Sequence, residues 1–132
     1  MRKVSMFVFS NPMKGMDKEY REWYVGQHVH DLLRIPGFVG CTFYKLVEPQ
    51  LYGTVEDKNY RYIMIWDWET DDVEAVYKEI LDRKKDGRTT FCAAFDRNVG
   101  NIIAAPITKY ITADEISGMT PEEILALSGM EG

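Results

Sequence analysis

The sequence predicts an α+β fold in which two helices cover one face of a four-stranded antiparallel sheet. Three observations support it: four segments rich in β-branched and aromatic residues, two amphipathic segments with helical spacing, and a β-α-β-β-α-β order along the chain. At 132 residues the chain is long enough for one hydrophobic core and short for two. We therefore expect one domain at residues 1–113 and an extension at residues 114–132.

The first half of the predicted domain begins with a strand and a helix. Lys3–Ser10 is rich in Val and Phe, and Asn11-Pro12 ends this strand. Asp17 is a suitable N-cap for a helix over Lys18–Leu33, and Pro36-Gly37 prevents the helix from continuing.

Two strands and a second helix follow. Phe38–Val47 and Tyr60–Trp68 have the composition of strands, and the polar residues between them form a loop. Thr70 is a plausible cap for a helix from Val73 to about Lys85, which has one apolar face and which Gly87 closes.

The last third of the chain is less regular. Residues 89–98 could form one or two helical turns, and Asn101–Ala113 is expected to be the last strand, with Pro106 requiring an edge position or a bulge. The complete order is that of the split βαβ, or ferredoxin-like, fold. In the extension, Thr120 and Glu123 form a capping box for a short helix, whose apolar residues should pack on the domain or on another subunit.

Both faces of the predicted sheet are expected to be covered. The strands carry large apolar residues at odd and even positions, as in Ile63–Trp66. Helices cover one face, and a second copy of the chain is the simplest cover for the other, since two-fold dimers are the commonest oligomers. We expect a homodimer that forms through the sheet faces.

Composition argues against several classes of partner. Sixteen basic and twenty-one acidic residues give a net charge of −5, which disfavours binding to nucleic acid or to an anionic membrane. No apolar segment approaches the roughly 18 residues of a membrane span. Without a recognisable export signal we expect a cytoplasmic protein, in which Cys41 and Cys92 are free thiols.

Both histidines of the chain fall in the first predicted helix. At about 100° per residue, His28 lies within the apolar face between Tyr24 and Leu32, whereas His30 lies at the edge of that face close to Trp23. Because the two rings point in different directions, and no other cluster of ligands has suitable spacing, we expect no metal site.

His28 is a candidate for core packing or for acid–base chemistry. A histidine on a buried helix face needs partners for its ring nitrogens or a cavity to face. Asp31 could accept a hydrogen bond from one nitrogen and leave the other free for proton transfer. Tyr20, Tyr24 and Gln27 bring further hydrogen-bonding groups to the same side.

Residues Asn11–Leu46 resemble the opening of EthD-like proteins in the dimeric α+β barrel superfamily. In that family a strand and a polar loop lead to a helix with a WY…H pattern, after which PGF enters the second strand. The matching positions are Trp23, Tyr24, His28, Leu32, Pro36, Gly37 and Phe38. His30 departs from the family pattern, in which proline is frequent two residues after the histidine.

The resemblance implies subunits that pair through their sheets, each with a cavity between its helices and its sheet. It also implies a cofactor-free lyase, isomerase or cyclase that acts on an aromatic or apolar oxygenated molecule of a catabolic or polyketide-type pathway. His28 would be the general acid/base, Asp31 its orienting group, and Tyr24 or Tyr20 the donor to a developing oxyanion. Neither a metal nor a nucleotide cofactor is expected.

The lining of this cavity depends on which face each strand presents. The first strand offers either Phe7 and Phe9 or Met6 and Val8, and the strand at residues 60–68 offers either its even or its odd positions. We favour the aromatic sets because they can stack on a flat ligand. The expected substrate-binding residues are therefore Tyr20, Trp23, Gln27, Phe7, Phe9, Tyr62, Met64 and Trp66, with Phe91 and Phe95 as a possible lid.

The alternative is a non-catalytic small-molecule binding or assembly module of the same fold. In that case both ring nitrogens of His28 are held by protein groups, and the cavity only holds a ligand or is packed shut. A solvent-reachable cavity on the order of a few hundred Å³ with His28 at its wall distinguishes an open site from a closed core.

Overall fold

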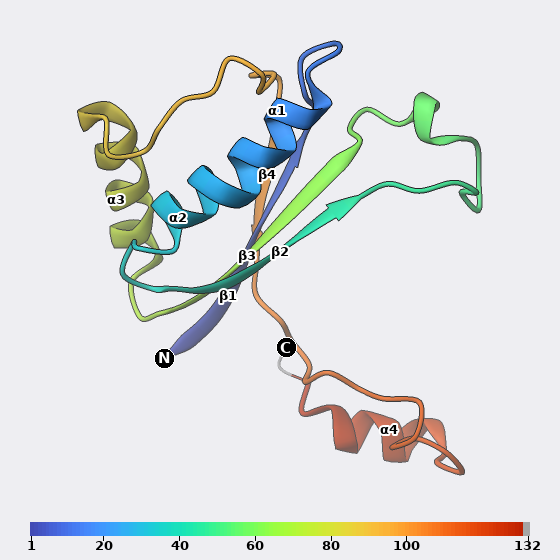
Figure 1. Cartoon of the computed structure of the whole chain (residues 1–132). Helices are drawn as coiled ribbons and strands as arrows, with labels where there is room; N and C mark the ends of the chain where they lie inside the picture. The colour runs from blue at the N-terminus through green and yellow to red at the C-terminus, as the bar shows by residue number, and fades with distance from the viewer. Residues whose placement is uncertain (131–132) are drawn as a thin grey trace.

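The computed structural model describes residues 1–130 and confirms the ferredoxin-like fold. Its strands form one antiparallel sheet in the order β2-β3-β1-β4. Figure 1 shows α1, α2 and α3 on the same side of this sheet. The elements are β1 (Arg2–Ser10), α1 (Asp17–Glu22), the π-helix η1 (Trp23–His28), α2 (Val29–Leu32), β2 (Phe38–Lys45), the 3-10 helix η2 (Val55–Asp57), β3 (Tyr62–Thr70), α3 (Val73–Asp86), β4 (Gly100–Ala104) and α4 (Pro121–Ser128).

The core lies between the helices and the even-numbered residues of β1 and β3. Met6 pairs with Trp66 and Val8 pairs with Met64 across the ladder, and all four side chains are buried. Trp66 and Trp68 are among the largest fully buried side chains, and truncating a buried tryptophan costs on the order of 3 to 5 kcal/mol. These two residues therefore fix β3 against the helical layer.

The opposite face of the sheet is apolar, and no helix of residues 1–130 lies over it. Phe7 pairs with Ile65 of β3 and with Ile102 of β4, while Phe9 pairs with Ile63. The side chains of β1 and β3 in these pairs are only partly buried, and Ile102 of β4 is 54% exposed. This face is the one that the sequence predicts to be covered by a second subunit.

The N-caps predicted for the two helices that pack on the sheet differ from the structure. Asp17 is the first residue of α1 and not its N-cap, and its carboxylate lies 3.6 Å from the Arg61 guanidinium. Strand β3 continues to Thr70, so the cap of α3 falls on Asp72, whose carboxylate accepts a hydrogen bond from the Ala75 amide at 3.0 Å. Thr70 is the last residue of β3, and the helix begins three residues later, so Thr70 is too far from the first turn to be its N-cap.

The predicted helical turns at residues 89–98 and the long last strand are also wrong. The backbone of this segment bonds to the loop after β1, where Phe95 forms a bridge with Pro12, so its hydrogen bonds do not close into a helix. Strand β4 ends at Ala104, the partner of Ser5, and Pro106 has no amide hydrogen with which to extend the ladder.

Gly37 is required where the first helical layer turns into β2. Its φ is +101°, and a Cβ at this position would lie 3.3 Å from Cγ2 of Val76 on α3. Its carbonyl accepts a hydrogen bond of 2.8 Å from the Glu69 amide. The close approach holds α3 against the end of the sheet and so positions one wall of the site described below.

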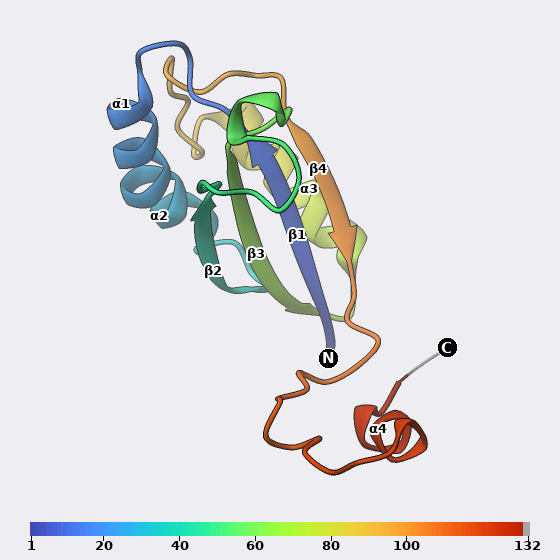
Figure 2. The ribbon, with the colours of Figure 1, turned by 90° about the vertical axis from the view of Figure 1, so that its right-hand side faces the viewer.

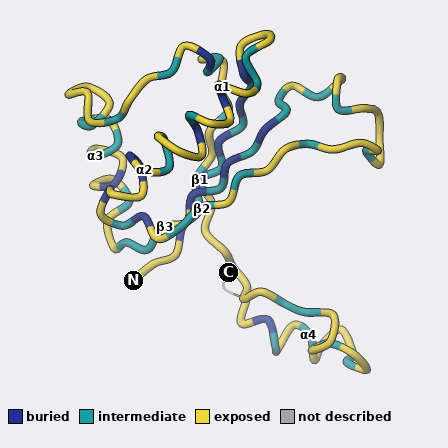
Figure 3. The backbone as a smooth tube through the Cα atoms, in the orientation of Figure 1, coloured by how far each residue is buried: buried dark blue, intermediate teal, exposed yellow. Residues whose placement is uncertain are grey.

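The C-terminal extension stands apart from the rest of the subunit. Figures 1 and 2 show α4 beyond the end of the sheet, and Figure 3 shows the extension as mostly exposed. The predicted capping box is confirmed, because Thr120 Oγ1 accepts from the Glu123 amide and the Glu123 carboxylate accepts from the Thr120 amide. The expectation that this helix packs on its own domain is wrong, whereas packing on another subunit stays a prediction. The last two residues of the expected extension lie outside the described residues.

Candidate functional site

A cavity of about 520 Å³ lies between the sheet, the first helical layer, α3 and the irregular segment after α3. Met6, Val8 and Trp66 form its floor on the sheet, and Asn101 of β4 borders it. A volume of this size is within the range of small-molecule sites. The cavity therefore lies where the resemblance implies one, between helices and sheet.

The π-helix η1 determines which side chains meet at the cavity. In a π-helix the backbone bonds connect residues five apart, so Trp23 and His28 lie on the same face, and their rings stack with centroids 4.6 Å apart. A phase of 100° per residue instead predicts Trp23 beside His30. The structure corrects this expectation: the His30 side chain is 58% exposed, and Trp23 lines the cavity with His28.

His28 lies at the cavity wall within a set of aromatic rings. Besides Trp23, the ring of Tyr24 lies edge-on at 5.1 Å and that of Trp66 at 5.7 Å between centroids. Nδ1 of His28 is buried and has no hydrogen-bond partner among the described residues. Burial lowers the pKa of His28 to about 4, and the charge of Lys84 acts in the same direction while Asp31 opposes it. The imidazole is therefore neutral at pH 7.

Asp31 is held by groups other than His28. Its carboxylate accepts hydrogen bonds from Gln27 Nε2 at 2.8 Å and from the Thr90 amide at 2.9 Å, and His30 Nδ1 lies 3.4 Å away. Burial raises the pKa of this carboxyl, but the hydrogen bonds from Thr90, Gln27 and His30 outweigh burial and lower the pKa overall. The expected hydrogen bond from His28 to Asp31 is absent within residues 1–130. Asp31 instead fastens the helical layer to the segment that forms the outer wall of the cavity.

The two predicted tyrosines differ in their access to the cavity. Tyr24 lines it and is 1% exposed, and burial, followed by the neighbouring Tyr20, raises the pKa of its phenol well above the ordinary value. Tyr20 is fully buried, shares a hydrogen bond with the hydroxyl of Ser10, and is not among the lining residues. Burial also raises the pKa of Tyr20. Tyr24 is thus a neutral phenol that borders the site, whereas Tyr20 supports the core beneath it.

The prediction that Phe7 and Phe9 line the cavity is wrong. Side chains alternate along a strand, and β1 presents Met6 and Val8 to the cavity, which directs the two phenylalanines to the opposite face of the sheet. Aromatic character is a poor guide to which face of β1 borders the cavity, because both faces of this sheet are apolar.

The remaining predicted binding residues divide between the site and its support. Trp66 lines the cavity. Tyr62 and Met64 are buried on the same face of the sheet. They lie closer than Trp66 to the end of the sheet at Ser10, and they do not line the cavity. Gln27 is exposed and contacts the site only through Asp31.

Two cationic residues at the cavity are absent from the sequence-based prediction. Lys84 of α3 and Arg97 of the following segment both line it, and the Arg97 guanidinium lies 4.6 Å from the ring centroid of Phe91. Lys84 is four residues after Ile80, another lining residue, so its helical spacing is a signal that could have found it. Arg97 lies in an irregular segment whose path the sequence does not reveal. Phe91 and Phe95, the possible lid, also line the cavity, and Phe91 is 60% exposed.

The described residues contain neither a cluster of metal ligands nor a helix that could span a membrane. Within residues 1–130, histidine, cysteine and acidic side chains form no group of three or more that could hold a metal ion. None of the helices in this range has the length and apolar character needed to cross a membrane. Both cysteines are free.

The fold and this cavity define a ferredoxin-like α+β protein, and solved structures share the fold. An EthD-like protein from Ralstonia eutropha superposes with a TM-score of 0.61 at 13% identity, covering 86% of this chain and 98% of that one. SnoaB from Streptomyces nogalater, described as a cofactor-independent oxygenase, has a TM-score of 0.53 at 16% identity, with coverage of 86% and 99%. A dimeric ferredoxin-like protein of unknown function from Thermobifida fusca has a TM-score of 0.56 at 11% identity, with coverage of 80% and 92%.

These similarities bear on the fold. The structural likeness to an EthD-like protein confirms the ferredoxin-like fold that the resemblance implies. No protein-family model matches the chain, and no curated protein matches it in sequence.

Proposed function

We propose that this protein is a small enzyme that needs no cofactor and transfers protons on an aromatic or otherwise apolar oxygenated molecule, as a lyase, isomerase or cyclase. One observation carries the proposal. A histidine that is neutral at pH 7 stands at the wall of a cavity of about 520 Å³ whose other walls are mainly apolar and aromatic. A neutral imidazole can accept a proton, and water is displaced from such a cavity when an apolar ligand binds.

His28 is assigned the role of general base and, once protonated, of general acid. Its Nδ1 is buried, so Nε2 is the ring nitrogen that we assign to the substrate. The stacked Trp23 ring fixes the plane of the imidazole. A cation formed at His28 during proton transfer is stabilised by the face of the stacked Trp23 ring, which offsets part of the cost of its burial.

Tyr24 is assigned as the hydrogen-bond donor to the oxygen that gains charge when a proton leaves the substrate. Its phenol is neutral because burial raises its pKa, and Tyr24 lies edge-on to His28 in the same cavity. A donor that is in place before the reaction stabilises an enolate or phenolate without reorganisation. Asp31 acts indirectly, by holding the outer wall through the Thr90 amide.

A cofactor-independent oxygenase is a second candidate, which the likeness to SnoaB favours. The first step is the same, because removal of a proton by His28 yields a substrate anion. In an oxygenase this anion reacts with dioxygen, whereas in an isomerase or cyclase it is protonated again or attacks within the molecule. Consumption of oxygen during turnover, measured with an oxygen electrode, distinguishes the two.

We also propose that the chain forms a homodimer through the apolar face of its sheet. Phe7, Ile65 and Ile102 form a continuous row across three strands on this face, and none of the helices in the described part of the chain covers it. An apolar sheet face of this kind is typically covered in the folded assembly. A solved protein of the same fold is described as dimeric, which supports the proposal.

The experiment that tests the enzymatic role follows proton exchange on a model carbon acid. β-Tetralone, a bicyclic aromatic ketone, exchanges the hydrogens next to its carbonyl with D₂O, and NMR follows the rate. We expect the wild-type protein to accelerate exchange, His28→Gln to lose about 10²- to 10⁴-fold of that acceleration, and the matched control His30→Gln to retain it. Equal rates in the wild type and His28→Gln would exclude His28 as the base.

A further inference from the structure

We propose that the natural ligand of the cavity carries a carboxylate on its apolar body, and that Lys84 and Arg97 recognise this group. The inference rests on the proposed function in that it concerns the same cavity, but it depends on different residues and has its own test. It specifies the substrate class as an aromatic or apolar carboxylate.

The charges at the cavity are of one sign. Lys84 and Arg97 both line it, and no aspartate or glutamate is among the lining residues of the described chain. The sign of the charge at the cavity is thus opposite to that of the whole protein, which has a net charge of −5. Two cations beside an apolar space create a positive potential that favours a ligand with one anionic end.

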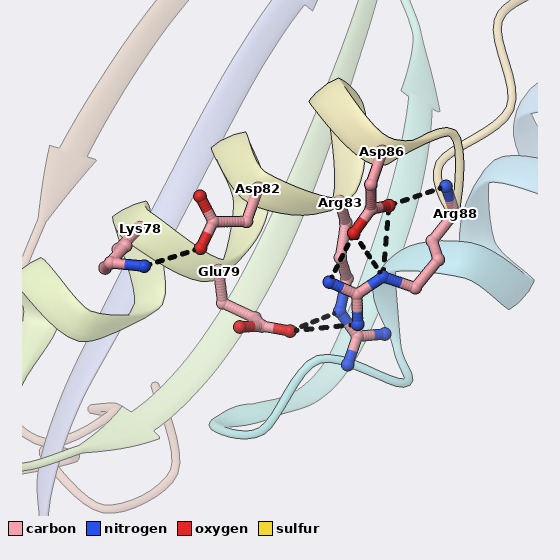
Figure 4. A network of polar contacts seen from close by, with 6 residues as sticks. All are labelled: Lys78, Glu79, Asp82, Arg83, Asp86 and Arg88. Carbon is pink, nitrogen blue, oxygen red and sulfur yellow. Dashed lines mark hydrogen bonds and ion pairs between the residues drawn. The ribbon is translucent and has the colours of Figure 1, made fainter.

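The basic residues of α3 differ in their partners, and two of them, Lys78 and Arg83, are paired with carboxylates. Figure 4 shows that Lys78 contacts Asp82, at 2.6 Å, and that Arg83 contacts Glu79, at 2.7 Å. Arg88, just after the helix, pairs with Asp86 at 2.7 Å and reaches Glu79 at 3.5 Å. Lys84 and Lys85, by contrast, have no ion pair within residues 1–130, and of these two only Lys84 lines the cavity. Its ammonium group is available to a ligand.

Arg97 is held at the cavity by an aromatic ring and not by an acid. The guanidinium lies over Phe91, whose ring also lines the cavity, and Arg97 too has no ion pair in the described part of the chain. A cation–π contact positions the guanidinium but leaves its N–H groups free to donate. A planar guanidinium suits two parallel hydrogen bonds to a carboxylate.

A carboxylate at this position also couples to His28. Burial is the main cause of the low pKa of His28, and the positive charge of Lys84 lowers it further. A bound carboxylate that pairs with Lys84 offsets this contribution, so the substrate itself makes His28 a stronger base. The recognition of the anion and the proton transfer are thus connected across one cavity.

The test compares two ligands that differ in charge but share their ring system. β-Naphthoate and β-naphthamide are titrated into the wild-type protein by isothermal titration calorimetry at low ionic strength. We expect the naphthoate to bind about tenfold more tightly than the neutral amide, as expected for a hydrogen-bonded charge pair at a partly exposed site. The double variant Lys84→Met, Arg97→Met should remove this preference while binding the amide as before.

Lys85→Met is the matched control, because it removes the same charge from the next residue of α3, which does not line the cavity. This control should keep the preference, and so should His28→Gln, which tests the proposed function and not the recognition of the anion. Equal affinity for the two ligands, a preference that survives in the double variant, or no binding of naphthoate at millimolar concentration would each overturn the proposal. The first two results leave the acid–base role of His28 untouched.

Discussion

The low pKa of His28 predicts a specific loss of stability at acidic pH. An ordinary histidine has a pKa of about 6.5, whereas burial lowers that of His28 to about 4. Between these values the unfolded chain binds a proton that the folded protein does not, so the free energy of unfolding falls as the pH is lowered. The difference corresponds to about 3 kcal/mol when integrated over the whole window.

The assay compares two proteins in the His30→Gln background, which removes the other histidine of the chain. Urea unfolding is measured at several pH values from 7 to 4 for this protein and for the same protein with His28→Gln. Acidic groups lower the stability of both proteins alike, so the difference between the two curves isolates His28. We expect the protein that retains His28 to lose about 3 kcal/mol more than the variant between pH 6.5 and 4. Parallel curves, or a gain in relative stability on acidification, would refute the buried neutral histidine.

Four further results are expected. Gly37→Ala should lower the free energy of unfolding by about 1 to 3 kcal/mol more than Gly87→Ala. Both glycines have a positive φ, but only a Cβ at Gly37 would contact a neighbouring side chain. Equal losses of stability in thermal melting would contradict this close packing. Phe7→Glu should convert a dimer to a folded monomer in light scattering, and a persistent dimer would place the interface elsewhere. Truncation after Ala113 should weaken the dimer if the extension packs on a second subunit, so an unchanged dissociation constant would count against that packing. Tyr24→Phe should slow β-tetralone exchange about tenfold or more with an unchanged melting temperature, and an unchanged rate would remove its role as donor.

Much of the fold could be predicted from the sequence because several signals agree in each element. Three local features each correspond to the expected element: the aromatic and β-branched composition of Tyr60–Trp68, the Pro36-Gly37 stop and the capping box at Thr120. The errors occur where a tertiary contact decides. In residues 89–98, the backbones of Ala94 and Asp96 are hydrogen-bonded to the loop after β1. Strand β4 ends at Ala104, two residues before Pro106.

The candidate site was predicted in part. His28, Tyr24 and Trp23 line the cavity as expected, but their arrangement depends on a π-helix, and no property of Trp23–His28 in the sequence indicates that five-residue spacing replaces the usual one. Phe7 and Phe9 were assigned to the wrong face because both faces of the sheet are apolar. Arg97 could not be placed before the path of the segment after α3 was known.

The central claim, that His28 is a neutral base at the wall of a ligand cavity, is tested most directly by the pH dependence of β-tetralone exchange. The rate that the wild-type protein adds to the background is measured from pH 8 to 4. We expect it to stay nearly constant down to about pH 5 and to fall below that as His28 gains a proton, because burial lowers its pKa to about 4. A rate that falls with a midpoint near pH 6.5, or that is undiminished at pH 4, would contradict the claim.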